Sequence, residues 1–337
     1  GYPVTGDFGD YLAGEGVAAV TVELTNHEEP EFERNLDGVR SLLDAVDDIV
    51  GAEATAVGAQ YLSIDKDTTG TARFPANTFI HPLALTVVDR TAYLLDSGRI
   101  LALSLDRAEA PEVILTSGDY VDDVRVLELL DLTNSGTSLL ALDRAGDVYS
   151  YDPSGKSWML ERYDRPVRDT YDHYFVALDA DRDANYLLET THEQVWRFAS
   201  GKAGAAWVSL PQRRDVDVSA SDAGLYVLTR SLNSPGASLL HFRDGQRIAE
   251  FAPNVDIVHP RQVVAASEAV FVLDRAGRRL LDLEPETGEL RALHQFPDRS
   301  AVSAVWADPG GKQVILAGRD TLYFLGQPEI QMVVEGG

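Results

Sequence analysis

The amino-acid sequence predicts a mainly β protein: a six-bladed β-propeller preceded by a small α/β segment of one strand and one helix. Two observations predict the propeller. A hairpin of two short apolar strands recurs six times, and further apolar runs flank it. Four-stranded units repeated every 40 to 50 residues or so are typical of propeller blades, because each small twisted sheet buries its faces only against neighbouring sheets.

The second strand of each predicted hairpin is the most regular element of the repeat. Successive copies start 48, 47, 44, 41 and 42 residues apart. They occupy residues 100–103, 148–151, 195–198, 239–242, 280–283 and 322–325. Six copies at this spacing predict six blades.

The first strand of each hairpin precedes the second by a short turn. These first strands occupy residues 93–96, 140–143, 186–189, 226–229, 271–274 and 314–317. Three of the turns begin with an aspartate and contain a glycine: those at Asp96, Asp143 and Asp274. Aspartate bonds nearby backbone groups in turns and glycine supplies positive φ, so we expect these carboxylates to be structural.

Apolar runs outside the hairpins predict the remaining two strands of each blade. Examples are residues 85–88, 175–178 and 263–266 before hairpins and 113–115 after one. A strand from one end of the chain can close the ring, and residues 60–64 and 330–334 are the candidates. We expect residues 60–64 to do so.

The repeats lack the Trp-Asp ending of WD repeats and resemble the divergent propellers of the NHL and gluconolactonase type. That resemblance concerns a fold shared by unrelated functions, and by itself it implies no chemistry. The predicted domains are residues 1–50, then 51–78 as a linker and possible closing strand, then 79–337 as the propeller. Because the chain begins at Gly1 without methionine, we expect it to be a piece of a longer protein.

Residues 1–50 do not follow the repeat. Residues 20–24 predict a strand, and 30–50 predict a helix with apolar residues on one face. The segment resembles the closing part of a zinc carboxypeptidase domain, through Tyr2, Gly6, Asp10, Gly16 and residues 21–24.

In that family a tyrosine on a mobile loop closes over the substrate, and a glutamate activates zinc-bound water. The resemblance implies these roles for Tyr2 and Glu23. The family's zinc ligands, a His-x-x-Glu pair and a later histidine, would lie upstream, and none of the seven histidines here begins such a pair. The resemblance therefore implies a zinc metallopeptidase parent, with zinc bound outside this chain and this chain inactive alone.

The amino-acid composition limits the classes of molecule and the kinds of site that we expect for this protein. The net charge is −25, from 54 acidic against 29 basic residues, which opposes binding to nucleic acid. The absence of cysteine excludes disulfides and thiolate metal sites. No apolar stretch is long enough for membrane insertion. We expect a monomer, and we favour an extracellular or cell-envelope location for the parent, although the sequence does not fix the compartment.

Polar residues precede the innermost strands of several predicted blades, where propellers have one mouth of their central channel. The candidate ligand-binding residues there are His81, Asp122, Asp123, Asp172, His173, Arg214 and His259. Converging polar groups can form a pocket or hold a cation. The alternative is that loops are polar in any protein.

The acidic string 179–183 resembles part of a calcium loop. It lacks the required glycine and has Thr190 where a bidentate glutamate would be needed, so it predicts a turn.

Three functions remain open. The leading one is a non-catalytic binding or scaffolding propeller, fused behind a carboxypeptidase-like domain and contacting a protein, peptide or glycan at its rim. The second is a propeller hydrolase or lactonase with a divalent cation held by carboxylates such as Asp122, Asp123 and Asp172. The third is a purely structural repeat module.

Overall fold

The computed structural model describes residues 61–63, 68–75, 78–106, 110–163, 174–199, 204–210, 213–231, 237–251, 257, 260–274, 278–296, 302–318 and 320–326. The chain divides into two compact units, Gly1–Thr55 and Ala56–Gly337, and all described residues belong to the second. The predicted α/β segment, with Tyr2 and Glu23, therefore lies outside the described residues.

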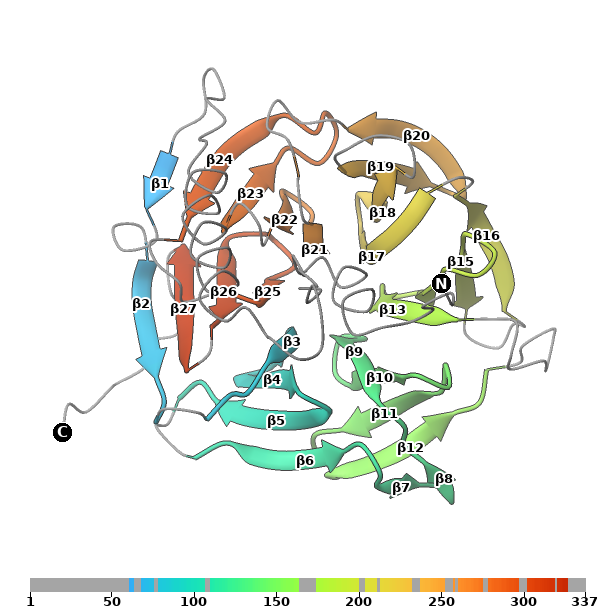
Figure 1. Cartoon of the computed structure of the whole chain (residues 1–337), viewed down its shortest axis with the longest axis vertical. Coiled ribbons are helices and arrows are strands. Elements are labelled where there is room, and N and C mark those ends of the chain that lie inside the picture. Colours follow the sequence, from blue (N-terminus) through green and yellow to red (C-terminus); the bar gives the residue numbers. More distant parts are fainter. Residues whose placement is uncertain are drawn as a thin grey trace, which may run out of the picture. The chain divides into compact units, whose positions relative to one another are not determined.

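Six sheets arranged around a ring confirm the predicted propeller (Figure 1). Blade 1 contains β3 (Pro82–Val88), β4 (Thr91–Asp96), β5 (Arg99–Ser104) and β6 (Glu112–Thr116). Blade 2 contains β9 (Leu129–Asn134), β10 (Leu139–Asp143), β11 (Val148–Asp152) and β12 (Ser157–Glu161). Blade 3 contains β13 (Phe175–Ala180), β14 (Ala184–Glu189), β15 (Gln194–Ala199) and β16 (Ala205–Ser209).

The other three blades follow the same plan. Blade 4 contains β17 (Arg213–Ser221), β18 (Gly224–Ser231), β19 (Ala237–Arg243) and β20 (Gln246–Phe251). Blade 5 contains β21 (Pro260–Ala265), β22 (Val270–Asp274), β23 (Arg279–Leu283) and β24 (Leu290–Gln295), with β1 (Tyr61–Ser63) added at its edge. Blade 6 contains β25 (Ala304–Ala307), β26 (Gln313–Ala317), β27 (Thr321–Gly326) and β2 (Thr68–Arg73).

All six predicted hairpins lie where the sequence places them. The second strand of each blade is buried almost throughout, as in β10 and β22, where every residue is buried. Such strands are continuously apolar because a blade packs against neighbours on both faces. Between blades 1 and 2, for example, Leu95 and Ile100 pack in one cluster with Tyr149. The core therefore lies between blades.

The ring is closed by β2, so the expectation that residues 60–64 close it is wrong. β2 pairs antiparallel with β27, with Ala72 opposite Leu322. Residues 61–63 pair instead with β24 in blade 5. β2 ends a short loop before Pro82, the first residue of blade 1, so the chain passes from the closing strand of blade 6 into blade 1.

The closing strand does not stand out as an apolar run in the sequence, because its residues are mostly polar: Thr-Thr-Gly-Thr-Ala-Arg. Its one buried apolar side chain, Ala72, is 1% exposed and packs in a cluster with Ile315 and Phe324. The alternative candidate, residues 330–334, lies outside the described residues.

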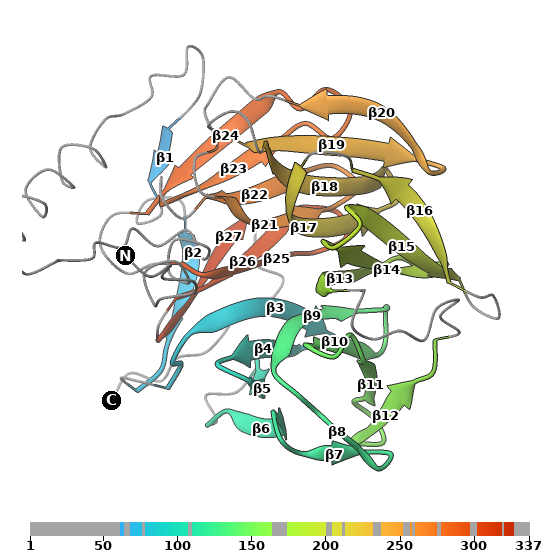
Figure 2. The ribbon, with the colours of Figure 1, turned by 45° about the vertical axis from the view of Figure 1, so that its right-hand side comes forward.

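In blades 1 to 4 the strands run from the centre of the ring to its circumference in chain order. Blades 5 and 6 follow the same order through β21–β24 and β25–β27, with β1 and β2 added outermost (Figures 1 and 2). β3, β9, β13, β17, β21 and β25 are therefore the innermost strands. Among the residues described, no helix is long and apolar enough to span a membrane.

Candidate functional site: polar side chains of the innermost strands

Three consecutive innermost strands each carry a carboxylate at their inter-blade contact: Asp131 on β9, Asp179 on β13 and Asp217 on β17. Asp131 Oδ2 accepts a hydrogen bond from the backbone N–H of Leu178 in the next blade, at 2.7 Å. Asp217 Oδ2 accepts one from Val263 N–H, again in the next blade, at 2.7 Å. Each carboxylate therefore joins two blades.

Asp179 joins three blades. Its Oδ1 accepts from Thr133 Oγ1 on β9 at 2.6 Å. Its Oδ2 accepts from Ser219 Oγ at 2.8 Å and from Ala220 N–H at 2.7 Å, both on β17. Its position in the middle of the series makes it the most connected of the three carboxylates.

Neutral polar side chains continue the same pattern around the ring. Ser219 Oγ accepts from Ala265 N–H at 2.9 Å, and Gln262 Oε1 accepts from Val305 N–H at 2.9 Å. We call the whole set the interblade belt, which consists of Thr86, Asp131, Thr133, Asn134, Asp179, Asp217, Ser219 and Gln262. It spans five of the six joints between blades; among the described residues no belt bond joins β25 to β3.

The belt has a simple physical reason. An innermost strand pairs with only one neighbour in its own sheet, so the N–H groups on its other edge have no partner in that sheet. A buried N–H left without an acceptor costs about 1–3 kcal/mol. A polar side chain from the preceding blade supplies the acceptor, which explains polar residues in otherwise apolar strands.

Burial raises the pKa of each of the three carboxylates. It raises the pKa of Asp131 to about 7, against the hydrogen bonds from Leu178 and Leu132, which lower that pKa. It also raises the pKa of Asp179, and it raises the pKa of Asp217 well above its usual range, with the charge of Asp131 as the next cause. Neighbouring carboxylates that repel each other lose their protons in coupled steps, so the titration of Asp131 depends on the charges of its neighbours.

A raised pKa in the folded state predicts that the belt carboxylates stabilise the fold less as the pH rises. The folded state holds these protons more tightly than the unfolded chain, so the free energy of unfolding falls between the unfolded value, near pH 4, and the folded value. The Asp217→Asn variant keeps an oxygen acceptor for Val263 N–H and removes the charge. We expect its melting temperature to exceed that of the wild type at pH 8, with the gain lost at pH 4.

The corresponding gain in the free energy of unfolding at pH 8 is about 1.4 kcal/mol for each unit by which the pKa of Asp217 is raised. The control is Asp152→Asn, because Asp152 is exposed at the end of β11. Thermal unfolding of both variants across the pH range measures the difference. A shift in melting temperature for Asp217→Asn that is equal at pH 4 and pH 8 would contradict the raised pKa.

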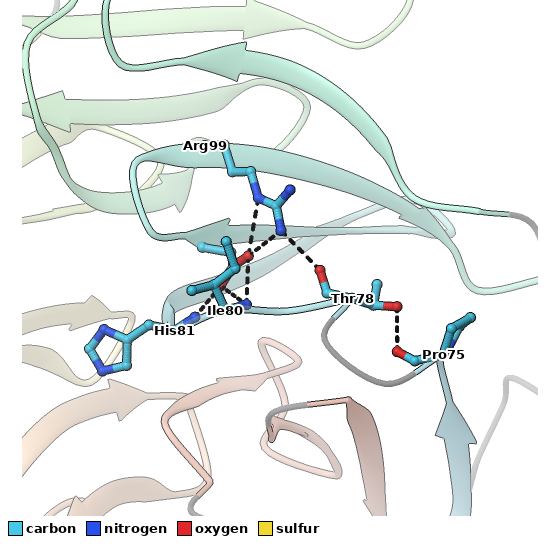
Figure 3. Close-up of polar contacts among 6 residues, drawn as sticks. Pro75, Thr78, Ile80, His81 and Arg99 are labelled. Atoms are coloured by element: carbon cyan, nitrogen blue, oxygen red, sulfur yellow. Dashed lines mark hydrogen bonds and ion pairs between the residues drawn. The ribbon is translucent and has the colours of Figure 1, made fainter.

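A second set of buried carboxylates lies at the ends of the second strands: Asp96, Asp143, Glu189 and Asp274 are each 0% exposed. Asp96 accepts from the N–H groups of Ile80 and His81, at 2.8 and 2.5 Å, and from Arg99 Nη2 at 2.8 Å (Figure 3). These bonds tie the loop that enters a blade to the hairpin turn of the same blade. The structural role predicted for Asp96 and Asp143 is confirmed.

Two described members of the predicted channel-mouth set, His81 and Arg214, lie at the starts of innermost strands. His81 is exposed just before β3, and its imidazole points away from the Asp96 contacts (Figure 3). Arg214 lies in β17 opposite Arg230. Asp172, His173 and His259 lie outside the described residues, so their predicted role stays a prediction.

Asp122 and Asp123 lie elsewhere than predicted. They form the turn of a hairpin of β7 (Tyr120–Val121) and β8 (Val124–Arg125), with φ angles of 48° and 66°. Asp122 Oδ2 accepts from Leu160 N–H at 2.9 Å, on β12, the outermost strand of blade 2. This extra hairpin between blades 1 and 2 moves both carboxylates from the ring centre to its circumference; whether they bind a ligand stays a prediction.

No group of three histidine, aspartate or glutamate side chains in the described part of the chain is arranged to hold a metal ion. The acidic string 179–183 forms the predicted turn, because Asp181 Oδ1 accepts from the N–H groups of Asp183 and Ala184 at 2.7 and 2.8 Å.

Three exposed apolar side chains lie on strands at the circumference of blades 1 and 2. We call this set the apolar margin, and it comprises Val113 on β6, Tyr120 on β7 and Met159 on β12, which are 50%, 70% and 54% exposed. β6, β7, β8 and β12 lie side by side in both views (Figures 1 and 2). Trp158 Nε1 donates a hydrogen bond to Ile114 O at 3.0 Å, which joins β12 of blade 2 to β6 of blade 1.

Comparison with solved structures agrees with the fold. A gluconolactonase from Xanthomonas campestris matches with a TM-score of 0.55 and 14% identity, covering 78% of this chain and 97% of that one. The PQQ-bound aldose sugar dehydrogenase from Streptomyces coelicolor matches with a TM-score of 0.51 and 12% identity, covering 76% and 98%. YCF48 bound to D1 peptide matches with a TM-score of 0.51 and 12% identity, covering 78% and 96%.

These likenesses show the fold. The predicted resemblance to gluconolactonase-type propellers is confirmed at that level. No protein-family model and no curated protein sequence matches the chain.

Proposed function

We propose that this chain is a non-catalytic binding propeller that contacts a protein or peptide partner through the apolar margin. The observation that carries the proposal is Tyr120, a large side chain 70% exposed on a hairpin that Asp122 ties to β12. Tyrosine and methionine are enriched at protein interfaces, and tyrosine supplies a large contact area at a low cost in conformational freedom.

The interblade belt supports a scaffolding role. Its hydrogen bonds join the blades at their innermost strands, and so fix the blades that carry the apolar margin relative to their neighbours. A preorganised surface loses less conformational entropy on binding than a mobile one. The likeness to a propeller described as bound to a peptide supports a ligand of this class, and a glycan at the same margin is the alternative ligand.

Selection of a phage-displayed random-peptide library on the wild-type protein tests the proposal. We expect the selected peptides to lose at least about tenfold in affinity on Tyr120→Ala or Met159→Ala, because truncating a central interface aromatic commonly costs more than 1 kcal/mol. The control is Ile248→Ala, since Ile248 is also exposed, at 48%, but on the outermost strand of blade 4. Binding is measured by fluorescence anisotropy.

Peptides whose affinity responds equally to Ile248→Ala and Tyr120→Ala would contradict the proposal.

A second contradiction would come from calorimetric titration with calcium and zinc. The second candidate is a propeller hydrolase or lactonase with a divalent cation held by carboxylates such as Asp122, Asp123 and Asp172, and its support is the likeness to a gluconolactonase fold. Tight stoichiometric calcium binding that Asp122→Asn abolishes would support that enzyme.

The fusion behind a zinc carboxypeptidase domain also remains a proposal. Its support is the order and spacing of residues from Tyr2 to Glu23 in the sequence. On this proposal zinc belongs to the parent protein and is held by ligands outside this chain.

A further inference from the structure

A buried histidine belongs to the contact between blades 4 and 5. His241, on β19, is 0% exposed. Its ring stacks on Tyr226 of β18, with ring centroids 4.3 Å apart, and lies 5.9 Å from the ring of Phe251 on β20. Tyr226 Oη donates a hydrogen bond to Pro285 O in blade 5 at 3.0 Å, and Gly288 of the same turn lies so close to Phe251 that a Cβ atom there would overlap its ring. The imidazole is therefore part of the aromatic group that joins blade 4 to blade 5.

The hydrogen bonds of His241 determine which ring nitrogen carries the proton. Nε2 lies 2.9 Å from Ala223 O. A carbonyl oxygen can only accept, so Nε2 carries the hydrogen and donates it. Nδ1 is buried and has no hydrogen-bond partner among the residues that the structure describes. A second proton would have to bind at Nδ1, where these residues offer no acceptor.

The groups around His241 disfavour its charged form. Burial lowers the pKa of His241, and the Arg243 guanidinium lowers it further, against the hydrogen bond to Ala223 and the charge of Glu286. Arg243 Nη2 donates to Ala223 O at 2.9 Å and to Glu286 at 2.8 Å, so the carboxylate that favours the charged ring is already paired with another cation. The Tyr226 phenol stays neutral, because burial raises its pKa. The facing residues of β20 carry no charge.

We propose that His241 is a pH switch that opens the contact between blades 4 and 5 in mild acid. At neutral pH the uncharged ring stays between its aromatic neighbours and holds Ala223 O. A buried charge without a hydrogen-bond acceptor is costly, so the doubly protonated ring moves into water. Its departure removes the stack on Tyr226 and loosens the turn of blade 5 that rests on this group. The inference goes beyond the proposed function, and it concerns other blades than the apolar margin does.

The sign of the pH dependence follows from the lowered pKa. The folded state holds this proton less tightly than the opened or unfolded chain. The free energy of opening therefore falls as the pH drops below the unfolded value, near 6.5, and becomes constant below the folded value. Within that window the equilibrium constant for opening rises up to about tenfold for each pH unit. The belt carboxylates change stability in the opposite direction, so variants must be compared with the wild type at the same pH.

The test compares the wild type with His241→Gln, whose side-chain amide can donate to Ala223 O and does not titrate. Hydrogen exchange is measured by mass spectrometry at pH 7.5 and pH 5.5, with rates corrected for the intrinsic pH dependence of exchange. We expect the amides of β19 and β20 in the wild type to lose at least about fivefold in protection at the lower pH, and His241→Gln to lose none. The control is His81→Gln, because His81 is exposed, and it should behave like the wild type.

Glu286→Gln supplies a second readout, which also tests the proposal if His241→Gln does not fold. Glu286 is exposed, and the substitution keeps an acceptor for Arg243 while removing a charge that favours the protonated ring. Protection of β19 and β20 should therefore fall at a lower pH than in the wild type. The proposal is overturned if Glu286→Gln moves this change to a higher pH, or if His241→Gln keeps the wild-type pH dependence. An equal loss of protection in all six blades would also overturn it.

Discussion

Replacing Asp143 with alanine is expected to lower the free energy of unfolding by about 3–5 kcal/mol, among the largest effects of any single substitution in this chain. Asp143 is 0% exposed, and its oxygens accept from the N–H groups of Leu127, Ala145 and Asp147 and from Tyr149 Oη, at 2.8 to 3.1 Å. Alanine removes all four acceptor contacts inside the protein.

Denaturant unfolding of Asp143→Ala measures that loss. Asp152→Ala is the matched control, because Asp152 is exposed and accepts a single turn bond from Ser154 N–H at 2.9 Å. It should cost about 1 kcal/mol or less. Equal destabilisation by the two variants would show that the buried carboxylate does not hold the turn and the entry loop together.

Replacing Ala72 with aspartate is expected to open the ring. Ala72 is 1% exposed in the closing strand, where it packs with Ile315 and Phe324. A carboxylate placed there has no partner, and an unpaired buried charge costs several kcal/mol. We therefore expect β2 to detach from β27, with a loss of about 3 kcal/mol or more in the free energy of unfolding.

Thermal unfolding and hydrogen exchange at Leu322, the residue opposite Ala72, measure this effect. Thr71→Asp is the control, because it places the same charge at the neighbouring exposed position of the same strand. If Thr71→Asp destabilised the protein as much as Ala72→Asp, the effect would come from charge on the strand and not from its buried contact.

The hairpins could be predicted from the sequence because each one is a local pattern of apolar residues and turn residues. The closing strand could not, because its partner lies near the other end of the chain and its sequence contains a single apolar residue, Ala72. The location of Asp122 and Asp123 was missed for a related reason: a hairpin of two-residue strands has too few residues to show a period.

The interblade belt was also missed, although a signal for it exists. Asp131, Asp217 and Gln262 each interrupt an otherwise apolar or alternating innermost strand at a buried or half-buried position. A polar residue at such a position indicates an edge N–H that needs an acceptor. The sequence does not show which strand supplies that N–H, because the partners lie about one repeat apart, in different blades.

The pairing of β2 with β27 has a consequence for how the protein is made. Translation produces β2 before any blade and β27 after nearly all of them, and domains begin to fold as the chain emerges from the ribosome. β2, which contains Ala72, therefore has no strand partner while five blades and most of the sixth are synthesised. A product truncated before Thr321 contains every residue of β2 but has no strand for it to join. Only chains that extend through β27 can close the ring, so truncated chains cannot reach the closed fold.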